Sequence, residues 1–191
     1  MPPAALKSPQ CLQEIRDVLL ETYAINDAMN QLLLTHLDLR AWRAPLPGAK
    51  ARRGRTIAAI FAHLHNTRLR WVKNSAPHLK CPPPLDPYHC TIQQASAAHK
   101  KSAAACLAML TDALSCQPNR RVTKFFRDAV VPIWPAGSAM FCYMFSHEAH
   151  HRGQILMLAH QLGYALPDVA RGGIWWWDKL WKQYNSRKRP R

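Results

Sequence analysis

Residues 146–154 read Ser-His-Glu-Ala-His-His-Arg-Gly-Gln and lie inside the longest apolar-rich run of the chain. Ser138 is a candidate N-cap for this run and Gly163 a stop signal, which predicts one helix of about 25 residues. Within it, His147 and His151 are spaced i, i+4, so both imidazoles lie on one face, one turn apart. Two neutral imidazoles in this arrangement can chelate one divalent metal ion. The run therefore predicts a long helix that supplies two ligands of a metal site.

The competing interpretation is that these histidines are solvated or hydrogen-bonded structural residues. The pair favours the ligand interpretation, because a polar stripe on an apolar helix costs free energy unless something satisfies it. His150 is offset from His147 by about 60° around the helix. It is either an outer-shell group or a surface residue.

Three further helices are predicted from hydrophobic periodicity, and no alternating strand pattern of useful length is present. They span about 10–39, 56–74 and 91–115, and proline- or glycine-containing breaks separate them. Together with the histidine helix they predict an all-α four-helix bundle. A short Trp-rich helix is expected after them, because Trp177 and Trp181 share an i, i+4 face that can dock onto the bundle.

Length and composition predict a single domain over residues 1–191, with flexible ends at 1–9 and 187–191. No apolar run is long enough to span a membrane, and the N-terminus lacks the apolar core of a signal peptide. The six cysteines form no Cys-x-x-Cys pair. They are expected to be reduced thiols, which indicates a cytoplasmic protein.

The chain is strongly basic, with 26 Lys and Arg against 11 Asp and Glu and a net charge of +15. The excess is concentrated in residues 40–55, 120–127 and 187–191. Such clusters can neutralise the phosphates of nucleic acids, but solvated loops and tails have the same composition. Because no nucleic-acid-reading motif accompanies them, nucleic-acid binding is kept as a minor alternative.

A metal site on the histidine helix needs a third donor from another helix. The second predicted helix offers His63 and His65, which lie about 200° apart, so only one of them can face the bundle axis. His63 continues the inward line of Ile57 and Ile60 and is the preferred ligand. His65 is the reserve.

Two motifs resemble the DinB/YfiT-like superfamily of bacterial four-helix-bundle metalloproteins. They are Ile-Ala-Ala-Ile-Phe-Ala-His at 57–63 and His-Glu-Ala-His-His-Arg-Gly-Gln at 147–154. The order of long helices is also similar, as is Leu-Gly-Tyr-x-Leu-Pro at 162–167 before a Trp-containing end, so the resemblance covers nearly the whole chain.

The resemblance implies a metal triad of His63, His147 and His151, typically holding nickel or zinc, with open coordination positions for water or a small-molecule substrate. Characterised relatives include thiol-dependent S-transferases and an isomerase, which use low-molecular-weight thiols such as bacillithiol or mycothiol. Many members have no known activity. The resemblance also points to a homodimer. The sequence offers two surfaces for that contact, the helix face with Phe145, Ala149 and Leu156 and the tryptophan cluster at 175–181.

A zinc peptidase is a competing interpretation, because residues 147–151 also match His-Glu-x-x-His. The longer form of that motif fails, since Gly153 comes one place early and position 157 is Met157. Glu148 is the last glutamate of the chain, so only Asp168 remains as a downstream carboxylate ligand. No strand-rich protease domain precedes the helix. A peptidase is therefore a minor alternative.

Glu148 and Tyr143 are the candidates for catalytic roles beside the metal. Glu148 is expected at the rim of the metal face, as a base or as a partner for Arg152 or another cation. Tyr143 precedes His147 by one turn and can donate a hydrogen bond to a substrate. Arg152 is expected to be structural, as is Gly153, which would permit close approach of a neighbouring helix.

Side-chain nucleophiles are not expected to carry the chemistry. Cys142 and Ser146 are turned from His147 by about 140° and 100° around the helix, and Ser146 has no evident base. An open metal position is the remaining option. Three classes of function stay open: a metalloenzyme of the thiol-transferase or hydrolase type, a non-catalytic metal-binding stress-response protein, and a basic nucleic-acid-associated protein with a structural metal.

Overall fold

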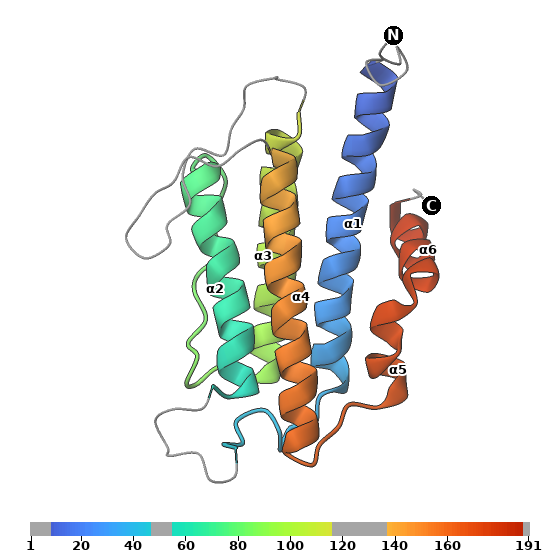
Figure 1. The fold of residues 1–191 in the computed structure, drawn as a ribbon. Helices are drawn as coiled ribbons and strands as arrows, with labels where there is room; N and C mark the ends of the chain where they lie inside the picture. The colour runs from blue at the N-terminus through green and yellow to red at the C-terminus, as the bar shows by residue number, and fades with distance from the viewer. Residues whose placement is uncertain (1–8, 47–54, 116–136, 189–191) are drawn as a thin grey trace.

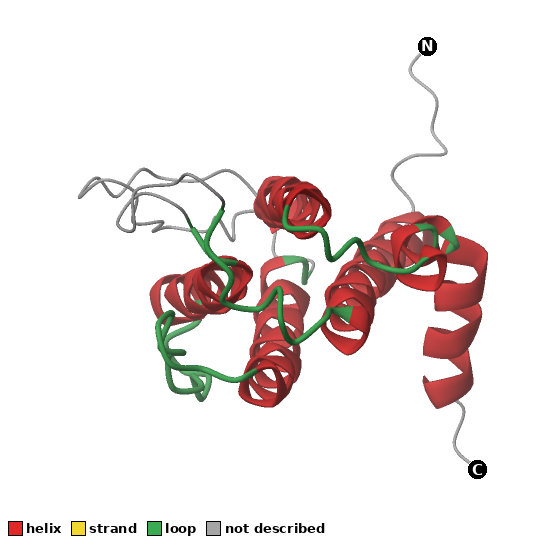
Figure 2. Cartoon of the chain, turned by 90° about the horizontal axis from the view of Figure 1, so that it is seen from below, coloured by secondary structure: helices red, strands yellow, loops and turns green. Residues whose placement is uncertain are grey.

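Four long helices form the bundle in the computed structural model, which describes residues 9–46, 55–115 and 137–188. They are α1 (Pro9–His36), α2 (Ile57–Ser75), α3 (Ile92–Ala113) and α4 (Gly137–Gln161) (Figure 1). Both α1 and α2 pack against α3 and α4, so α1 lies diagonally across from α2 when the bundle is viewed end-on (Figure 2). No strand occurs among the residues described. The predicted all-α four-helix bundle is confirmed.

Two threonines fix the starts of α2 and α3. The hydroxyl of Thr56 accepts a hydrogen bond from the amide of Ala59 at 3.2 Å, which satisfies a donor left open at the first turn. At α3, Thr91 accepts from Gln94, and the Gln94 side chain accepts from the Thr91 amide. This is a reciprocal capping box, so both helix starts are encoded locally.

Helix α1 ends earlier than the sequence predicts, at His36 and not near residue 39. The reason is the side chain of Asp38, which accepts a hydrogen bond from the amide of Arg40 at 2.8 Å. This local bond competes with helix continuation and starts the turn toward α2. Trp42 then closes the connection by donating its indole N–H to the Cys90 carbonyl at 2.9 Å.

Helix α4 begins at Gly137, so the predicted N-cap residue Ser138 is inside the helix. Its end agrees with the stop signal: Gly163 adopts a φ of 78°, in the left-handed region that glycine tolerates. The amide of Tyr164 then donates to the carbonyl of Ala159 at 2.9 Å, which closes the last turn.

The C-terminal segment folds along α1 on the side away from α2 (Figures 1 and 2). It contains α5 (Asp168–Arg171), the 3-10 helix η2 (Gly173–Trp175) and α6 (Trp177–Lys188). The Trp181 indole donates to the carboxylate of Glu21 at 3.0 Å, and the Trp177 ring lies 6.1 Å from the ring of Phe145. The expected short Trp-rich helix is therefore present and docked.

The core consists of two apolar clusters with a polar layer between them. One cluster includes Leu33 and Phe61, and the other includes Trp71 and Met109. At the intermediate level each long helix contributes buried polar side chains to the layer. These are Asn26 and Asn30 from α1, Arg68 from α2, His99 and Ser102 from α3, and Glu148 and Arg152 from α4.

Among the residues described, none of the helices has both the length and the apolar character needed to cross a membrane. The predicted basic group at 120–127 falls outside the described residues, as do 47–54 of the first basic group and 189–191 of the last.

Candidate metal centre

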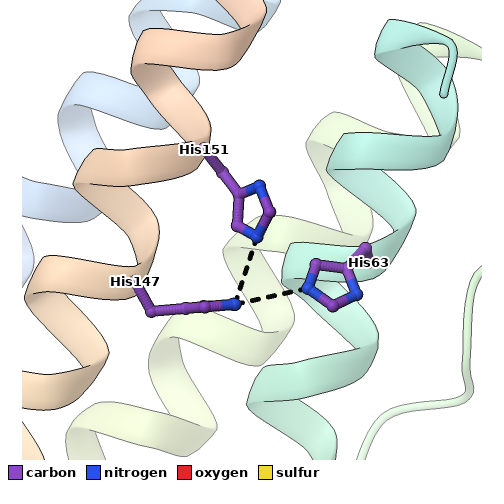
Figure 3. A group of neighbouring side chains, drawn as sticks. All are labelled: His63, His147 and His151. Carbon is purple, nitrogen blue, oxygen red and sulfur yellow. Dashed lines mark hydrogen bonds between the residues drawn. The ribbon is translucent and has the colours of Figure 1, made fainter. Parts of the chain in front are cut away.

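Three histidines from two helices converge at the face between α2 and α4 (Figure 3). His147 and His151 follow one another by one turn of α4, and His63 comes from α2. The Nε2 atom of His147 lies 3.3 Å from Nε2 of His63 and 3.2 Å from Nε2 of His151. We call this group the three-histidine cluster. It is the one group of three or more His, Cys, Asp or Glu donors with metal-site spacing within 9–46, 55–115 and 137–188.

The spacing of these nitrogens fits coordination of a single ion. Two imidazole nitrogens that are each about 2.0–2.1 Å from one ion, at a tetrahedral angle, lie about 3.3–3.4 Å apart. The ligand atoms of the cluster all lie within 4.8 Å of one another. The residues therefore fit a three-histidine site for one divalent ion.

The electrostatics of the cluster keep its rings neutral at physiological pH. Burial, followed by the charge of His151, lowers the pKa of His63 and of His147 to about 4. Burial also lowers the pKa of His151, despite the hydrogen bond that His151 donates to Gln154, which raises it. A neutral imidazole is the form that binds a metal ion, so the cluster does not have to lose protons at pH 7 before it acts as a ligand set.

His63 joins the cluster, and the reserve residue His65 does not. His65 is fully buried on the other side of α2, where its Nε2 lies 3.0 Å from the carbonyl of Pro83. Its ring centroid lies 6.0 Å from that of His99. His65 therefore connects α2 to α3 and to the proline-rich connector, residues 76–91, that joins the two helices. His150 is exposed, and its Nε2 contacts the amide nitrogen of Gln154 at 2.9 Å.

Glu148 points away from the cluster and into the polar layer. Its carboxylate accepts two hydrogen bonds from Arg68 at 2.7 Å, one to each oxygen, and two more from Asn26 and Asn30 at 2.7 Å. Burial raises the pKa of Glu148, but the charge and hydrogen bonds of Arg68 outweigh it and bring the pKa to about 2. Of the two expected roles, base or partner of a cation, the contacts favour the second.

The other members of the polar layer complete the back of α4. Arg68 also donates to Asp27 at 2.8 Å, and Arg152 donates to the side-chain oxygen of Asn26 at 2.6 Å. Arg152 thus faces away from the metal ligands, as expected. Sequence reasoning did not find Arg68 or the two asparagines. Their only signal is a polar residue at an apolar position, and that signal does not identify a partner on another helix.

The expectation for Gly153 is wrong. Gly153 is exposed, and a Cβ placed on it would meet no atom of the described residues within 4 Å, so none of the described helices approaches it closely. Tyr143 is half-buried, and its ring is stacked nearly parallel to that of His147, with centroids 6.2 Å apart. Cys142 and Ser146 are exposed side chains of α4.

Comparison with known proteins gives one match. The sequence model of the DinB family matches residues 19–183, a range that includes all three histidines of the cluster and both Trp177 and Trp181. No curated protein and no solved structure matches the chain.

Proposed function

The chain belongs to the DinB family, and on this basis we propose that it is a divalent-metal-dependent enzyme acting on a small molecule at His63, His147 and His151. The observation that carries the proposal is the convergence of three Nε2 atoms from α2 and α4. Nε2 of His147 lies 3.3 Å from Nε2 of His63 and 3.2 Å from Nε2 of His151. Nickel or zinc is the proposed ion, since both bind imidazole nitrogen.

The chemistry of the site follows from its ligands. Three neutral ligands leave a divalent ion its full charge, so it would lower the pKa of a bound water or thiol and supply a nucleophile at neutral pH. A thiol-dependent S-transfer or a hydrolysis is the proposed reaction class, with a low-molecular-weight thiol as co-substrate in the first case. Tyr143, stacked on His147, is the proposed side chain for orienting a substrate.

The charge around the cluster favours a substrate with an anionic group. The positive charge of Arg55 contributes, after burial and the neighbouring histidines, to lowering the pKa of His63, and Arg70 does the same. The nearest carboxylate on α4, that of Glu148, is bonded to Arg68 inside the bundle. An anion approaching the cluster therefore meets the positive charges of Arg55 and Arg70, while the Glu148 carboxylate, whose charge also acts on His147 and His151, is paired with Arg68.

The metal assignment is tested by elemental analysis of the purified protein and of three variants, His63→Ala, His147→Ala and His151→Ala. Each variant should lose its bound metal. His160→Ala is the matched control, because His160 is an exposed histidine of the same helix, and it should retain the metal. Stoichiometric metal in His147→Ala or His151→Ala would exclude the site.

Catalysis is tested with a chelator and readdition. Activity should vanish on metal removal, return with nickel or zinc, and survive Cys142→Ala and Ser146→Ala. Full turnover by verified metal-free protein would overturn the proposal. Metal binding without turnover of any thiol or ester substrate would favour the non-catalytic alternative, and salt-dependent DNA binding would favour the nucleic-acid alternative.

We also propose a homodimer of single-domain subunits in the cytoplasm. Of the two expected contact surfaces, the α4 surface is covered in part by the chain itself, because Phe145 packs against Trp177. Trp175 and Trp176 remain 77% and 42% exposed and are the proposed dimer contact. Sedimentation of wild type and Trp175→Glu tests this: a monomer near 21.7 kDa for wild type excludes it.

The thiols of Cys81, Cys90, Cys106 and Cys142 are free, which supports a reducing compartment.

A further inference from the structure

The outer nitrogen of one cluster histidine has a specific partner. His151 Nδ1 lies 2.7 Å from the side-chain oxygen of Gln154, and the side-chain nitrogen of Gln154 lies 2.9 Å from Nε2 of His150. Gln154 follows His151 by three residues and His150 by four, so a single turn of α4 holds the whole chain of contacts. Its inner end is the Nε2 atom of His151 in the cluster.

The chemistry of a carboxamide gives this chain a direction. The oxygen of Gln154 can only accept, so His151 must carry its ring proton on Nδ1 to make the 2.7 Å contact. The amide nitrogen can only donate, so His150 must accept through the lone pair of Nε2. A neutral His151 with its proton on Nδ1 has a free lone pair on Nε2, which is the atom aimed at the cluster.

The opposite orientation of the amide would have the opposite effect. With nitrogen and oxygen of Gln154 exchanged, the amide would donate to Nδ1 of His151, and the ring proton would have to move to Nε2. That proton would then lie in the histidine triangle, on a nitrogen that is 3.2 Å from Nε2 of His147, and would block metal binding by His151. In the structure the amide oxygen faces His151 and the amide nitrogen faces His150, which is the orientation that leaves the lone pair of His151 Nε2 free.

We propose that Gln154 is a positioning residue that holds His151 in the metal-binding tautomer, and that His150 fixes the orientation of the Gln154 amide. The inference rests on the proposed metal site. Partners on the outer nitrogen of a histidine ligand fix its tautomer and ring orientation and raise its basicity, and their loss typically costs about 10–100-fold in metal affinity.

The simpler interpretation is a surface glutamine that makes incidental contacts. The side chain of Gln154 is exposed, so its removal does not empty part of the core. A change in fold stability is therefore not expected under either interpretation. The tautomer of His151 and the metal affinity separate the two, because an incidental surface contact would affect neither of them.

The experiment uses the full chain with zinc as the probe. The ¹⁵N shifts of the imidazole nitrogens in the metal-free protein report the tautomer of His151, and competition with a chelator reports the zinc affinity. The variants are Gln154→Leu, which removes both contacts, Gln154→Glu, which keeps an acceptor for His151, and His150→Ala, which removes the anchor. Gln161→Leu is the matched control, an exposed glutamine of α4 beyond the cluster.

In wild type, His151 should be protonated on Nδ1. Gln154→Leu should shift the tautomer toward the Nε2-protonated form and weaken zinc binding by about 10-fold or more. Gln154→Glu should keep the wild-type tautomer, and Gln161→Leu should match wild type. The tautomer population and the zinc affinity of His150→Ala should lie between those of wild type and of Gln154→Leu. An unchanged His151 tautomer or an unchanged zinc affinity in Gln154→Leu overturns the inference.

Failure of the metal site itself would look different. If the wild-type protein binds neither zinc nor nickel, the proposed function fails, and the ¹⁵N shifts of the metal-free protein still decide whether Gln154 sets the tautomer of His151. If wild type binds zinc and Gln154→Leu binds it equally well, only the role of Gln154 is excluded.

Discussion

Arg68 is the residue on which the polar layer depends. Its side chain is 2% exposed, and it pairs with Glu148 and Asp27 at 2.7 and 2.8 Å. Removing one partner of a buried ion pair leaves an uncompensated charge, whereas replacing the whole pair with apolar groups can be close to neutral. The layer is thus more sensitive to single substitutions than to matched ones.

Arg68→Met should therefore destabilise the fold strongly, by about 3–5 kcal/mol, because it leaves the Glu148 carboxylate buried without its cation. The free energy of unfolding from urea titration gives the measurement. The double variant Arg68→Met/Glu148→Gln should recover part of the loss, since the more deeply buried of the two carboxylates that Arg68 pairs with is then uncharged. Arg40→Met is the control, because Arg40 pairs with Asp38 at the surface, and its unfolding midpoint should stay near wild type. Equal midpoints for Arg68→Met and Arg40→Met would contradict this account.

The proximity of site residues could be predicted from the sequence where helical spacing carries the information and not where it does not, while their role as metal ligands stays a prediction. The spacing of His147 and His151, and the inward line through His63, place three side chains that the structure brings together. Glu148 was expected at the rim of that group, because an angle around one helix does not tell which neighbouring helix fills the space beside it. Arg68, on another helix, draws Glu148 into the bundle.

At the scale of whole helices, α4 has two functional faces. His147 and His151 face α2 and make the cluster, while Glu148 and Arg152 face α1 and make the back of the polar layer. Because each face contains an i, i+4 pair, the polar layer and the cluster lie at the same level of α4. The layer therefore fixes the rotation of α4, and with it the direction of the histidines.

The start of α3 is predicted to depend on its capping box. Thr91→Ala removes the side-chain acceptor for the Gln94 amide and should cost about 1 kcal/mol of unfolding free energy. Thr111→Ala is the matched control: Thr111 is an exposed threonine inside the same helix, and alanine favours helix there. Urea titration compares the two variants. If Thr91→Ala is as stable as Thr111→Ala, the box does not set the start of α3.

Helix boundaries were predictable from the sequence only where local chemistry decides them. Gly163 and the prolines after α2 end helices through their own backbone conformation. That conformation does not depend on which helices pack nearby, so it can be predicted from the sequence. The end of α1 was placed about three residues late, because the periodic apolar pattern continues past His36 while the Asp38 turn already redirects the chain.

At the scale of the whole molecule, the polar layer separates two apolar clusters and so gives the bundle a fixed register. Leu33 and Phe61 belong to one cluster and Trp71 and Met109 to the other. A slide of α4 by one turn would bring Glu148 against apolar side chains, at a cost of several kcal/mol for an unpaired charge. The layer was not predicted, and a cation partner was only one of two roles expected for Glu148, because helix periodicity marks which residues are buried and not which of them meet across the bundle.

The polar layer also predicts how the protein unfolds in acid. Burial, together with the charge of Arg68, lowers the pKa of His99 to about 3, against about 6.5 in an unfolded chain. The unfolded state therefore takes up a proton first as the pH falls below 6.5. The stability that neutral His99 contributes is fully present above pH 6.5 and is lost as the pH approaches 3. For Glu148, with a folded pKa of about 2, the corresponding loss runs from about pH 4.5 down to 2.

The metal-free protein should thus lose unfolding free energy steadily below pH 6.5, with a second loss below pH 4.5. Each buried histidine that stays neutral contributes about 1.4 kcal/mol per pH unit to the first slope.

His99→Gln keeps a donor for the Phe61 carbonyl, which His99 contacts at 2.9 Å, and removes one titrating group. Its unfolding free energy should fall less steeply than that of wild type between pH 6.5 and 4.5, whereas His160→Gln, at an exposed position of α4, should follow wild type. Urea titrations at a series of pH values measure both slopes. Identical slopes for His99→Gln and wild type would mean that His99 is not held neutral by burial in the layer, and the low pKa would have to be abandoned.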